Sequence, residues 1–150
     1  MVLRKVSFGH FKQGLYTLKN PTKYVGDSSK IVYRSSWELH LHQFFDNNAH
    51  VLRWSSEEIV VPYVKPTDGK IHRYYPDYWV EFRNKQGKIV QELIEVKPHK
   101  QTKMPRASSK QKVVESVEFA INIAKWKSAQ AYAKQNGMTF RVVTELSIFK

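Results

Sequence analysis

Two apolar strands joined by a short polar turn occupy the middle of the sequence and determine where its most unusual charges must lie. Residues 78–83 and 89–96 are predicted to be strands, and the five residues between them include Asn and Gly, which favour turns. In an antiparallel pair with this turn, the numbers of opposed residues sum to about 172. Asp77 and Glu95 should therefore face each other, and Lys97 should point to the same face because side chains alternate along a strand.

The facing carboxylates of Asp77 and Glu95 predict a metal site. Two carboxylates opposite each other in a sheet repel, and sheets avoid the arrangement unless a cation lies between them. Glu95 also ends a strand in which Leu93, Ile94 and Val96 are apolar, and an unpaired charge is costly to bury. Oxygen ligands of this kind suit Mg²⁺, with Mn²⁺ as a substitute, better than zinc.

Phosphodiester hydrolysis is the reaction that suits these groups. A Mg²⁺ ion held by carboxylates neutralises the phosphate, lowers the pKa of a bound water molecule and stabilises the charge of the transition state. Lys97 would orient the attacking water or stabilise the reacting phosphorus centre. The sequence contains no cysteine, which excludes disulfides, thiolate zinc sites and cysteine nucleophiles.

Glu38 is a further candidate, and the sequence leaves two interpretations of it open. The run from Ser35 to Glu38 matches a helix capping box, in which the Glu38 carboxylate would only bind a main-chain donor. However, Leu41 and Phe45 follow Glu38 at helical spacing, so a helix here would turn all three side chains toward the sheet. In the second interpretation, Glu38 is a third ligand of the metal or of a water molecule.

The remaining patterns predict a helix, several strands, a long helix and a final strand. The first helix opens at residues 35–38 and runs up to Asn47-Asn48. Further strands are predicted at residues 51–54, 57–61, 71–75 and 138–144. This order favours an α/β fold with a central mixed β-sheet flanked by helices. Residues 1–30 are basic and rich in turn formers, and we expect them to form an arm or irregular cap.

The long helix is predicted from near Ser108, at a possible capping box with Gln111, to Asn136-Gly137. Its predicted core stripe consists of Val113, Val117, Ala120, Ile121, Ala124 and Ala131. A second apolar stripe, with Phe119, Ile123 and Trp126, is expected to pack against the N-terminal segment.

The charge of the chain favours a polyanionic partner. Lys and Arg total 25 against 13 Asp and Glu, a net charge of +12, and such an excess attracts nucleic acid or an anionic membrane. No signal peptide and no apolar stretch of about 18 residues is found, so we expect a cytoplasmic protein without a membrane partner. The basic residues that follow the catalytic strand are candidate DNA contacts: Lys100, Lys103, Arg106 and Lys110.

His72 is a weaker candidate for the site. It precedes Asp77 by five residues and would lie near the carboxylates. A lone histidine in a strand is more often a hydrogen-bonded structural residue. The motif Asp68-Gly69-Lys70 has the same acid-x-Lys spacing as Glu95-Val96-Lys97, but it lies in a predicted turn without an acidic residue opposite, so we do not place it in the site.

Pro76-Asp77 and Glu95-Val96-Lys97, preceded by a helix with Glu38, resemble the PD-(D/E)XK nuclease superfamily, which has the restriction endonuclease-like fold. Three segments, residues 33–38, 72–77 and 140–145, resemble the endonuclease subunit of heteromeric transposases. Residues 20–27 together with the helix after them resemble the head completion nucleases of contractile-tailed bacteriophages. Transposase relatives often have Gln in place of Glu95, so sequence-targeted transposition is the less favoured interpretation.

This resemblance implies a nuclease domain over residues 31–150 with Glu38, Asp77, Glu95 and Lys97 as catalytic residues, and with Glu38, Asp77, Glu95 and Val96 as metal ligands. It also implies an endonuclease, with exonuclease action left open, that acts on double-stranded DNA in late phage head assembly, after packaging and before head-tail joining. The expected location is the cytoplasm of the infected bacterium or the virion, with head or neck proteins as partners and no small-molecule cofactor. The alternative is a non-catalytic basic DNA-binding or virion-joining protein that keeps the nuclease fold.

Overall fold

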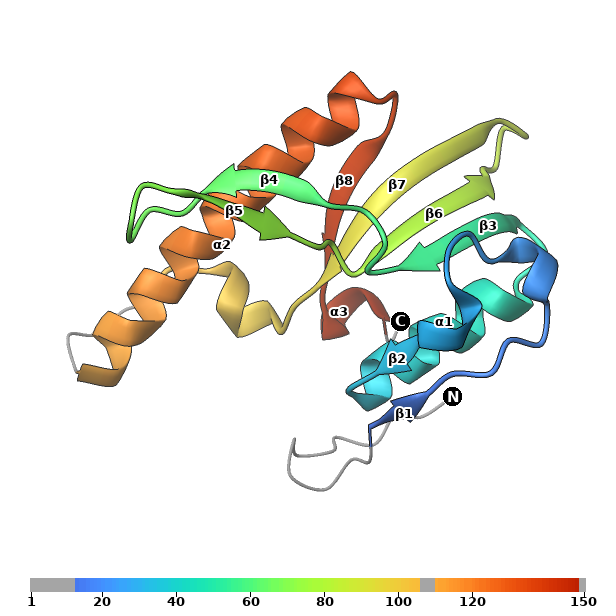
Figure 1. Ribbon diagram of the computed structural model, residues 1–150, viewed down its shortest axis with the longest axis horizontal. Helices are drawn as coiled ribbons and strands as arrows, with labels where there is room; N and C mark the ends of the chain where they lie inside the picture. The colour runs from blue at the N-terminus through green and yellow to red at the C-terminus, as the bar shows by residue number, and fades with distance from the viewer. Residues whose placement is uncertain (1–12, 106–109, 149–150) are drawn as a thin grey trace.

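A four-stranded mixed sheet forms the centre of the protein (Figure 1). The computed structural model describes residues 13–105 and 110–148. In the sheet, three antiparallel strands are followed by one strand parallel to its neighbour, in the order β3-β6-β7-β8. These strands are β3 (Val51–Ser56), β6 (Tyr78–Arg83), β7 (Ile89–Val96) and β8 (Thr139–Val143). Helices flank this sheet, which confirms the predicted α/β fold with a central mixed sheet.

The register of the β6-β7 hairpin confirms the predicted pairing. Tyr78 pairs with Ile94 and Trp79 with Leu93, and both pairs of numbers sum to 172. Gly87 has a φ of 77° in the turn, a conformation that glycine adopts without steric cost. The same register, continued by one residue, brings Asp77 to the position opposite Glu95.

Helix α1 (Ser36–Asn47) packs on one face of the sheet and begins where the capping pattern predicts. The Ser35 hydroxyl accepts a hydrogen bond of 3.1 Å from the Glu38 N–H, which stabilises the first turn. Phe45 of α1 packs with Trp54 and Tyr78 of the sheet in one buried aromatic cluster.

Residues 14–33 lie against α1 as short irregular elements (Figure 1). They comprise β1 (Gly14–Leu15), the 3₁₀ turns η1 (Pro21–Lys23) and η2 (Ser28–Lys30), and β2 (Val32–Tyr33). The buried carboxylate of Asp46 at the end of α1 binds this segment. It accepts hydrogen bonds from the Tyr16 hydroxyl and from the N–H groups of Lys19 and Asn20, at 2.8 to 3.0 Å. The described part of residues 1–30 is thus fixed both by a buried charge and by the packing of Tyr16, Leu18 and Tyr24 on the core.

The long helix α2 (Lys110–Gln135) covers the other face of the sheet together with the two-stranded β4-β5 ribbon (Figure 1). The ribbon consists of β4 (Val61–Val64) and β5 (Ile71–Tyr74). Gly137 follows α2 with a φ of 71°, as expected for a helix end. The predicted start at Ser108 lies outside the described residues. The 3₁₀ turn η3 (His99–Thr102) links β7 toward α2, and the short helix α3 (Glu145–Ile148) follows β8.

The predicted core stripe of α2 is wrong. Val113, Val117, Ala120 and Ala131 are exposed, and only Ile121 and Ala124 of that stripe are partly buried. The buried residues of the helix are Trp126, Ala129 and Ala133, which pack on β4, β5 and β7. Trp126 therefore packs with the sheet and the ribbon, and its cluster includes none of residues 13–30. The helix carries two apolar stripes, and the position of the ribbon selects the one that contains Trp126.

The predicted strand at residues 57–61 is also wrong. Glu57 has a φ of 54°, which is uncommon for a residue other than glycine, and the chain turns there between β3 and β4. The Glu57 N–H donates to the Asp77 carbonyl at 3.1 Å, and its carboxylate pairs with Arg34 at 2.6 Å. These two contacts hold a corner where the sequence pattern indicated an extended chain.

Within the described ranges, no helix has the length and apolar composition needed to cross a lipid bilayer.

Candidate active site

Asp77 and Glu95 meet at the end of the β6-β7 ladder. Glu95 is 5% exposed, although it carries a carboxyl group. Burial, followed by the charge of the neighbouring Glu95, raises the pKa of Asp77 well above its usual range. A carboxyl with a raised pKa favours its protonated form, which relieves the repulsion between the two groups when no cation is bound. The structure therefore brings together the two carboxylates that the register predicted.

The main chain of Val96 lies beside this pair. Its N–H donates to Asp77 Oδ2 at 2.7 Å. The N–H and C=O of a strand residue point the same way, so the Val96 carbonyl is also directed toward β6. The β6-β7 register, continued by two residues, places Pro76 opposite Val96, and Pro76 has no N–H to donate. Proline at this position leaves the Val96 oxygen available for another ligand.

Lys97 follows Glu95 by two residues and lies on the same side of the strand. Its Nζ is 4.0 Å from Glu95 Oε2, and its side chain is 28% exposed. The Lys97 N–H donates to the Val143 carbonyl of β8 at 2.9 Å. The main-chain bond to β8 thus fixes the backbone of Lys97, and its ammonium lies beside the carboxylate pair.

Glu38 approaches the site from the first turn of α1. Burial, opposed by a hydrogen bond from the Arg34 N–H, raises the pKa of Glu38, and the charge of Asp77 adds to the rise. Glu38 Oε2 accepts that hydrogen bond at 2.8 Å. The carboxylate therefore binds a main-chain donor at the helix start, as the capping interpretation requires. It also lies within the field of Asp77, as the ligand interpretation requires.

Sequence reasoning missed Glu57, a further acidic residue beside these carboxylates. Its charge contributes to the raised pKa of Glu38. Its ion pair with Arg34 and its bond to the Asp77 carbonyl connect the segment before α1 to the residue before β6. A positive φ at a glutamate has no sequence signal, so the residue could not have been found from the pattern alone.

His72 lies in β5, and its Nε2 is 2.7 Å from Asp68 Oδ2 in the adjacent turn. The structure thus gives His72 a partner in its own ribbon and does not bring it to the carboxylate pair. Asp68 also accepts from the Lys70 N–H at 2.9 Å. The acid-x-Lys motif at residues 68–70 therefore belongs to a turn, as predicted.

Of the candidate DNA contacts, Lys100 lies in η3 and Lys103 directly after it, and both are exposed. Lys110 is the first residue of α2, and its side chain lies outside the described set. Arg106 also lies outside the described residues. The described part of this basic segment follows Lys97 directly, so it begins at the same end of β7 as the carboxylate pair.

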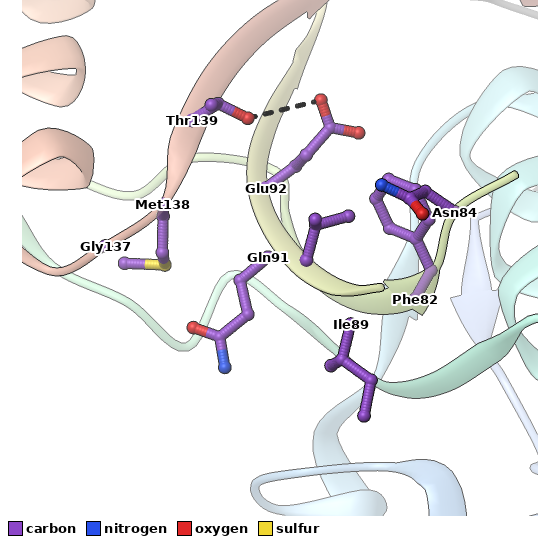
Figure 2. Close-up of a pocket in the computed structure, with 9 residues that line it drawn as sticks. Phe82, Asn84, Ile89, Gln91, Glu92, Gly137, Met138 and Thr139 are labelled. Carbon is purple, nitrogen blue, oxygen red and sulfur yellow. Dashed lines mark hydrogen bonds between the residues drawn. The ribbon is translucent and has the colours of Figure 1, made fainter. Parts of the chain in front are cut away.

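A pocket of about 590 Å³ lies at the far end of β7 from these carboxylates (Figure 2). Ile89, Gln91 and Glu92 of β7 line it together with Met138 and Thr139. The Thr139 hydroxyl and Glu92 are 3.5 Å apart, and no acidic pair is present among the lining residues. The candidate active site is therefore a surface at the end of the sheet, as expected for a long polymeric substrate, and not this pocket.

The donor set at the carboxylate pair fits a hard divalent cation. Within residues 13–105 and 110–148, no three Asp, Glu or His side chains gather closely enough to enclose a metal. Asp77, Glu95 and the Val96 carbonyl supply two charged oxygens and one neutral oxygen. Mg²⁺ commonly binds through one or two carboxylates and retains several water molecules. Burial and the charge of Glu95 raise the pKa of Asp77 although Lys97 lies nearby, and a bound cation would oppose both effects.

Comparison with known proteins adds an independent observation. Residues 48–145 match the family described as the TnsA-like endonuclease N-terminal domain, which is more than half of the chain. The chain belongs to the TnsA-like endonuclease family. The head completion nuclease of Enterobacteria phage T4 is 37% identical to it over 139 residues, which cover 88% of this chain and 90% of the phage protein.

The family membership confirms the resemblance that the motifs indicated. The range matched to the TnsA-like family contains Asp77, Glu95 and Lys97, whereas Glu38 precedes it. A TnsA-like endonuclease domain is consistent with the mixed sheet and flanking helices described above.

Proposed function

We propose that this protein is a metal-dependent DNA endonuclease that hydrolyses phosphodiester bonds. The observation that carries the proposal is the paired arrangement of Asp77 and buried Glu95 at the end of β7, beside the ammonium of Lys97. The TnsA-like family membership and the name of the phage T4 relative support a nuclease acting on DNA. Glu38 is proposed as the fourth member of the site.

Asp77, Glu95 and the carbonyl of Val96 would hold the metal ion, which we propose to be Mg²⁺ with Mn²⁺ as a substitute. Glu38 would bind it through a water molecule. When bound, such an ion supplies positive charge to the phosphate and acidifies water. The Lys97 ammonium, 4.0 Å from Glu95, would orient the attacking water or bind the phosphate oxygen on which charge develops. The Val96 N–H holds Asp77 in place.

The proposed setting is the late assembly of a phage head in the cytoplasm of the infected bacterium. The T4 relative is named a head completion nuclease, and its similarity spans most of both chains. We propose that this protein acts on packaged double-stranded DNA before head-tail joining, with head or neck proteins as partners, in the host cytoplasm or in the virion. No small-molecule cofactor is required by the site.

Incubation of the purified protein with circular and linear DNA tests the proposed activity. We expect Mg²⁺ or Mn²⁺ to support nicking or linearisation of circular DNA and EDTA to prevent it. Attack on linear DNA alone would show an exonuclease. DNA binding without cleavage in any metal would favour the non-catalytic DNA-binding or virion-joining protein.

Glu38→Gln should lose most of the cleavage activity while melting at nearly the wild-type temperature. The amide can still accept the hydrogen bond from the Arg34 N–H, so the helix start is preserved, but it binds a cation far more weakly than a carboxylate. Cleavage rates and thermal melts of the same preparation check this. Normal cleavage would show that Glu38 is a cap alone and would reduce the site to three side chains.

The basic segment after β7 should contribute to DNA affinity through phosphate contacts. Replacing Lys100, Lys103 and Arg106 with Ala in an Asp77→Asn background should weaken binding equally across DNA sequences and reduce the salt slope by about three at most. The double variant of Lys85 and Lys88 is the control, since both are exposed at the opposite end of β7. An unchanged slope in the triple variant would show that the segment is only a solvated surface.

A further inference from the structure

Lys125 of α2 occupies an aromatic setting that neither its sequence position nor the nuclease motif predicts. It lies next to buried Trp126 and one helical turn before buried Ala129. Its Nζ lies 5.7 Å from the ring centre of Tyr63 and 5.6 Å from that of Tyr74. These distances are within the range in which an ammonium is attracted to an aromatic face. Tyr63 belongs to β4 and Tyr74 to β5, so each strand of the ribbon places one ring beside this ammonium.

The aromatic setting of Lys125 lies on the face of the sheet that carries the candidate site. Leu93 belongs to the core cluster formed with Trp126 and the two tyrosines, and Glu95 follows Leu93 by two residues, on the same face. Burial, followed by the charge of Lys97, lowers the pKa of Lys125, and the charges of Glu95 and Asp77 act in the opposite direction. The ammonium therefore lies within the electrostatic field of the carboxylate pair.

The ammonium of Lys125 has fewer hydrogen-bond partners than it can bind. An ammonium can donate three hydrogen bonds, yet within the described residues Lys125 has only the two aromatic faces. The Tyr74 hydroxyl is buried, and burial followed by the charge of Glu95 raises its pKa, so this ring lies beside the carboxylate pair. The Lys125 side chain is only half-buried, so its ammonium remains accessible to an anion. A DNA phosphate that approaches the carboxylate pair would supply the anion that Lys125 lacks.

We propose that Lys125 binds a non-bridging phosphate oxygen of the DNA strand next to the phosphate that is cleaved, and that Tyr63 and Tyr74 act as positioning residues for its ammonium. The inference rests on the proposed nuclease function and extends its site from the sheet to α2 and the ribbon. Because this contact exists before and during the reaction, it contributes to substrate binding and not specifically to the transition state.

Salt titrations of DNA binding in the Asp77→Asn background, with Ca²⁺ present, test the contact. Lys125→Met should weaken binding to a short duplex and lower the salt slope by about one, because one phosphate contact is lost. Lys125→Arg should keep the slope. Lys127→Met is the matched control, since Lys127 is exposed on a different side of the same helix, and it should bind as the parent does.

Kinetics in the active protein distinguish the proposed role from others. We expect Lys125→Met to raise KM about fivefold at moderate salt, with kcat within a factor of two, because loss of uniform binding affects KM alone. Tyr74→Leu removes one aromatic face and should approach Lys125→Met, whereas Tyr74→Phe keeps that face and should raise KM less than Tyr74→Leu does. Lys125→Gln provides a second neutral variant if the methionine variant does not fold.

A full salt slope and an unchanged KM in folded Lys125→Met or Lys125→Gln would overturn the proposal and leave the lysine a packing role. A large fall in kcat at constant KM would also overturn it. The binding titration does not depend on cleavage. Failure of the wild-type protein to cut DNA with any metal would therefore contradict the proposed function, whereas an unchanged slope would contradict the Lys125 contact alone.

Discussion

Asp77→Asn should abolish DNA cleavage and leave the fold intact. The amide oxygen can still accept the hydrogen bond from the Val96 N–H, but the site loses one of the two charges that would bind the metal. Loss of metal assistance removes several kcal/mol of transition-state stabilisation, which corresponds to a decrease of about a thousandfold in the cleavage rate. Single-turnover cleavage of circular DNA measures this decrease directly.

The same variant should be more stable than the wild type when no metal is present. The raised pKa of Asp77 means that deprotonation is less favourable in the folded protein than in the unfolded chain. The cost to folding is therefore absent at low pH and develops as pH rises above the unfolded value of about 3.8. Asn carries no such cost, so Asp77→Asn should melt at a higher temperature than the wild type at pH 7 with EDTA.

Added Mg²⁺ should raise the melting temperature of the wild type much more than that of Asp77→Asn, since binding to the folded state alone stabilises it. Asp68→Asn is the matched control, because Asp68 is the acid of the other acid-x-Lys motif and lies in an exposed turn. It should cleave and respond to Mg²⁺ as the wild type does. Wild-type cleavage by Asp77→Asn would contradict the assignment of the site.

Asp46→Ala should cause the largest loss of stability among the single substitutions considered. The change removes the acceptor for the Tyr16 hydroxyl and for the N–H groups of Lys19 and Asn20. Donors left without a partner cost about 1 to 3 kcal/mol each when buried. Since Lys19 and Asn20 can reach water, we expect a total of about 3 kcal/mol, or a decrease of roughly 9 °C in Tm.

The effect of Asp46→Ala should depend on pH in a defined direction. Burial alone would raise the pKa of Asp46, but the hydrogen bonds from Lys19, Tyr16 and Asn20 outweigh it and lower the pKa below 3.8. The stabilising contribution is therefore complete at neutral pH and is lost as pH falls through the folded-state pKa. Denaturant unfolding of both proteins at pH 7 and below pH 4 checks this.

Asp27→Ala serves as the control for Asp46→Ala. Asp27 also accepts a main-chain hydrogen bond, from the Ser29 N–H, but its side chain is exposed. Water replaces the lost acceptor there, so the cost should remain below about 1 kcal/mol. Equal destabilisation by the two substitutions would show that the buried Asp46 carboxylate does not fix the N-terminal segment.

The position of the carboxylate pair could be predicted because it depends on local rules. A short turn sets the register of a hairpin, and the alternation of side chains then decides which residues share a face. Asp77, Glu95 and Lys97 are all located by these two rules. The helix that carries Glu38 was similarly marked by its cap at Ser35.

The parts that could not be predicted depend on tertiary contacts. Helix α2 has two apolar stripes, and only the packing of the β4-β5 ribbon decides that Trp126 is buried while Val117 is exposed. Lys125 was missed for the same reason. The turn at Glu57 needs Arg34 and the Asp77 carbonyl to hold its positive φ, and these partners are distant in sequence.

The parallel pairing of β7 with β8 has a consequence for when activity can arise during synthesis. Glu95 pairs with Val142, and the Lys97 N–H is bound by the Val143 carbonyl, 46 residues later in the chain. A chain that is still emerging from the ribosome lacks this support until β8 has been translated and has paired. Such distant contacts also form late in folding. Partly synthesised or truncated chains should therefore not cut DNA, which would protect templates in the same cell from unfinished nuclease.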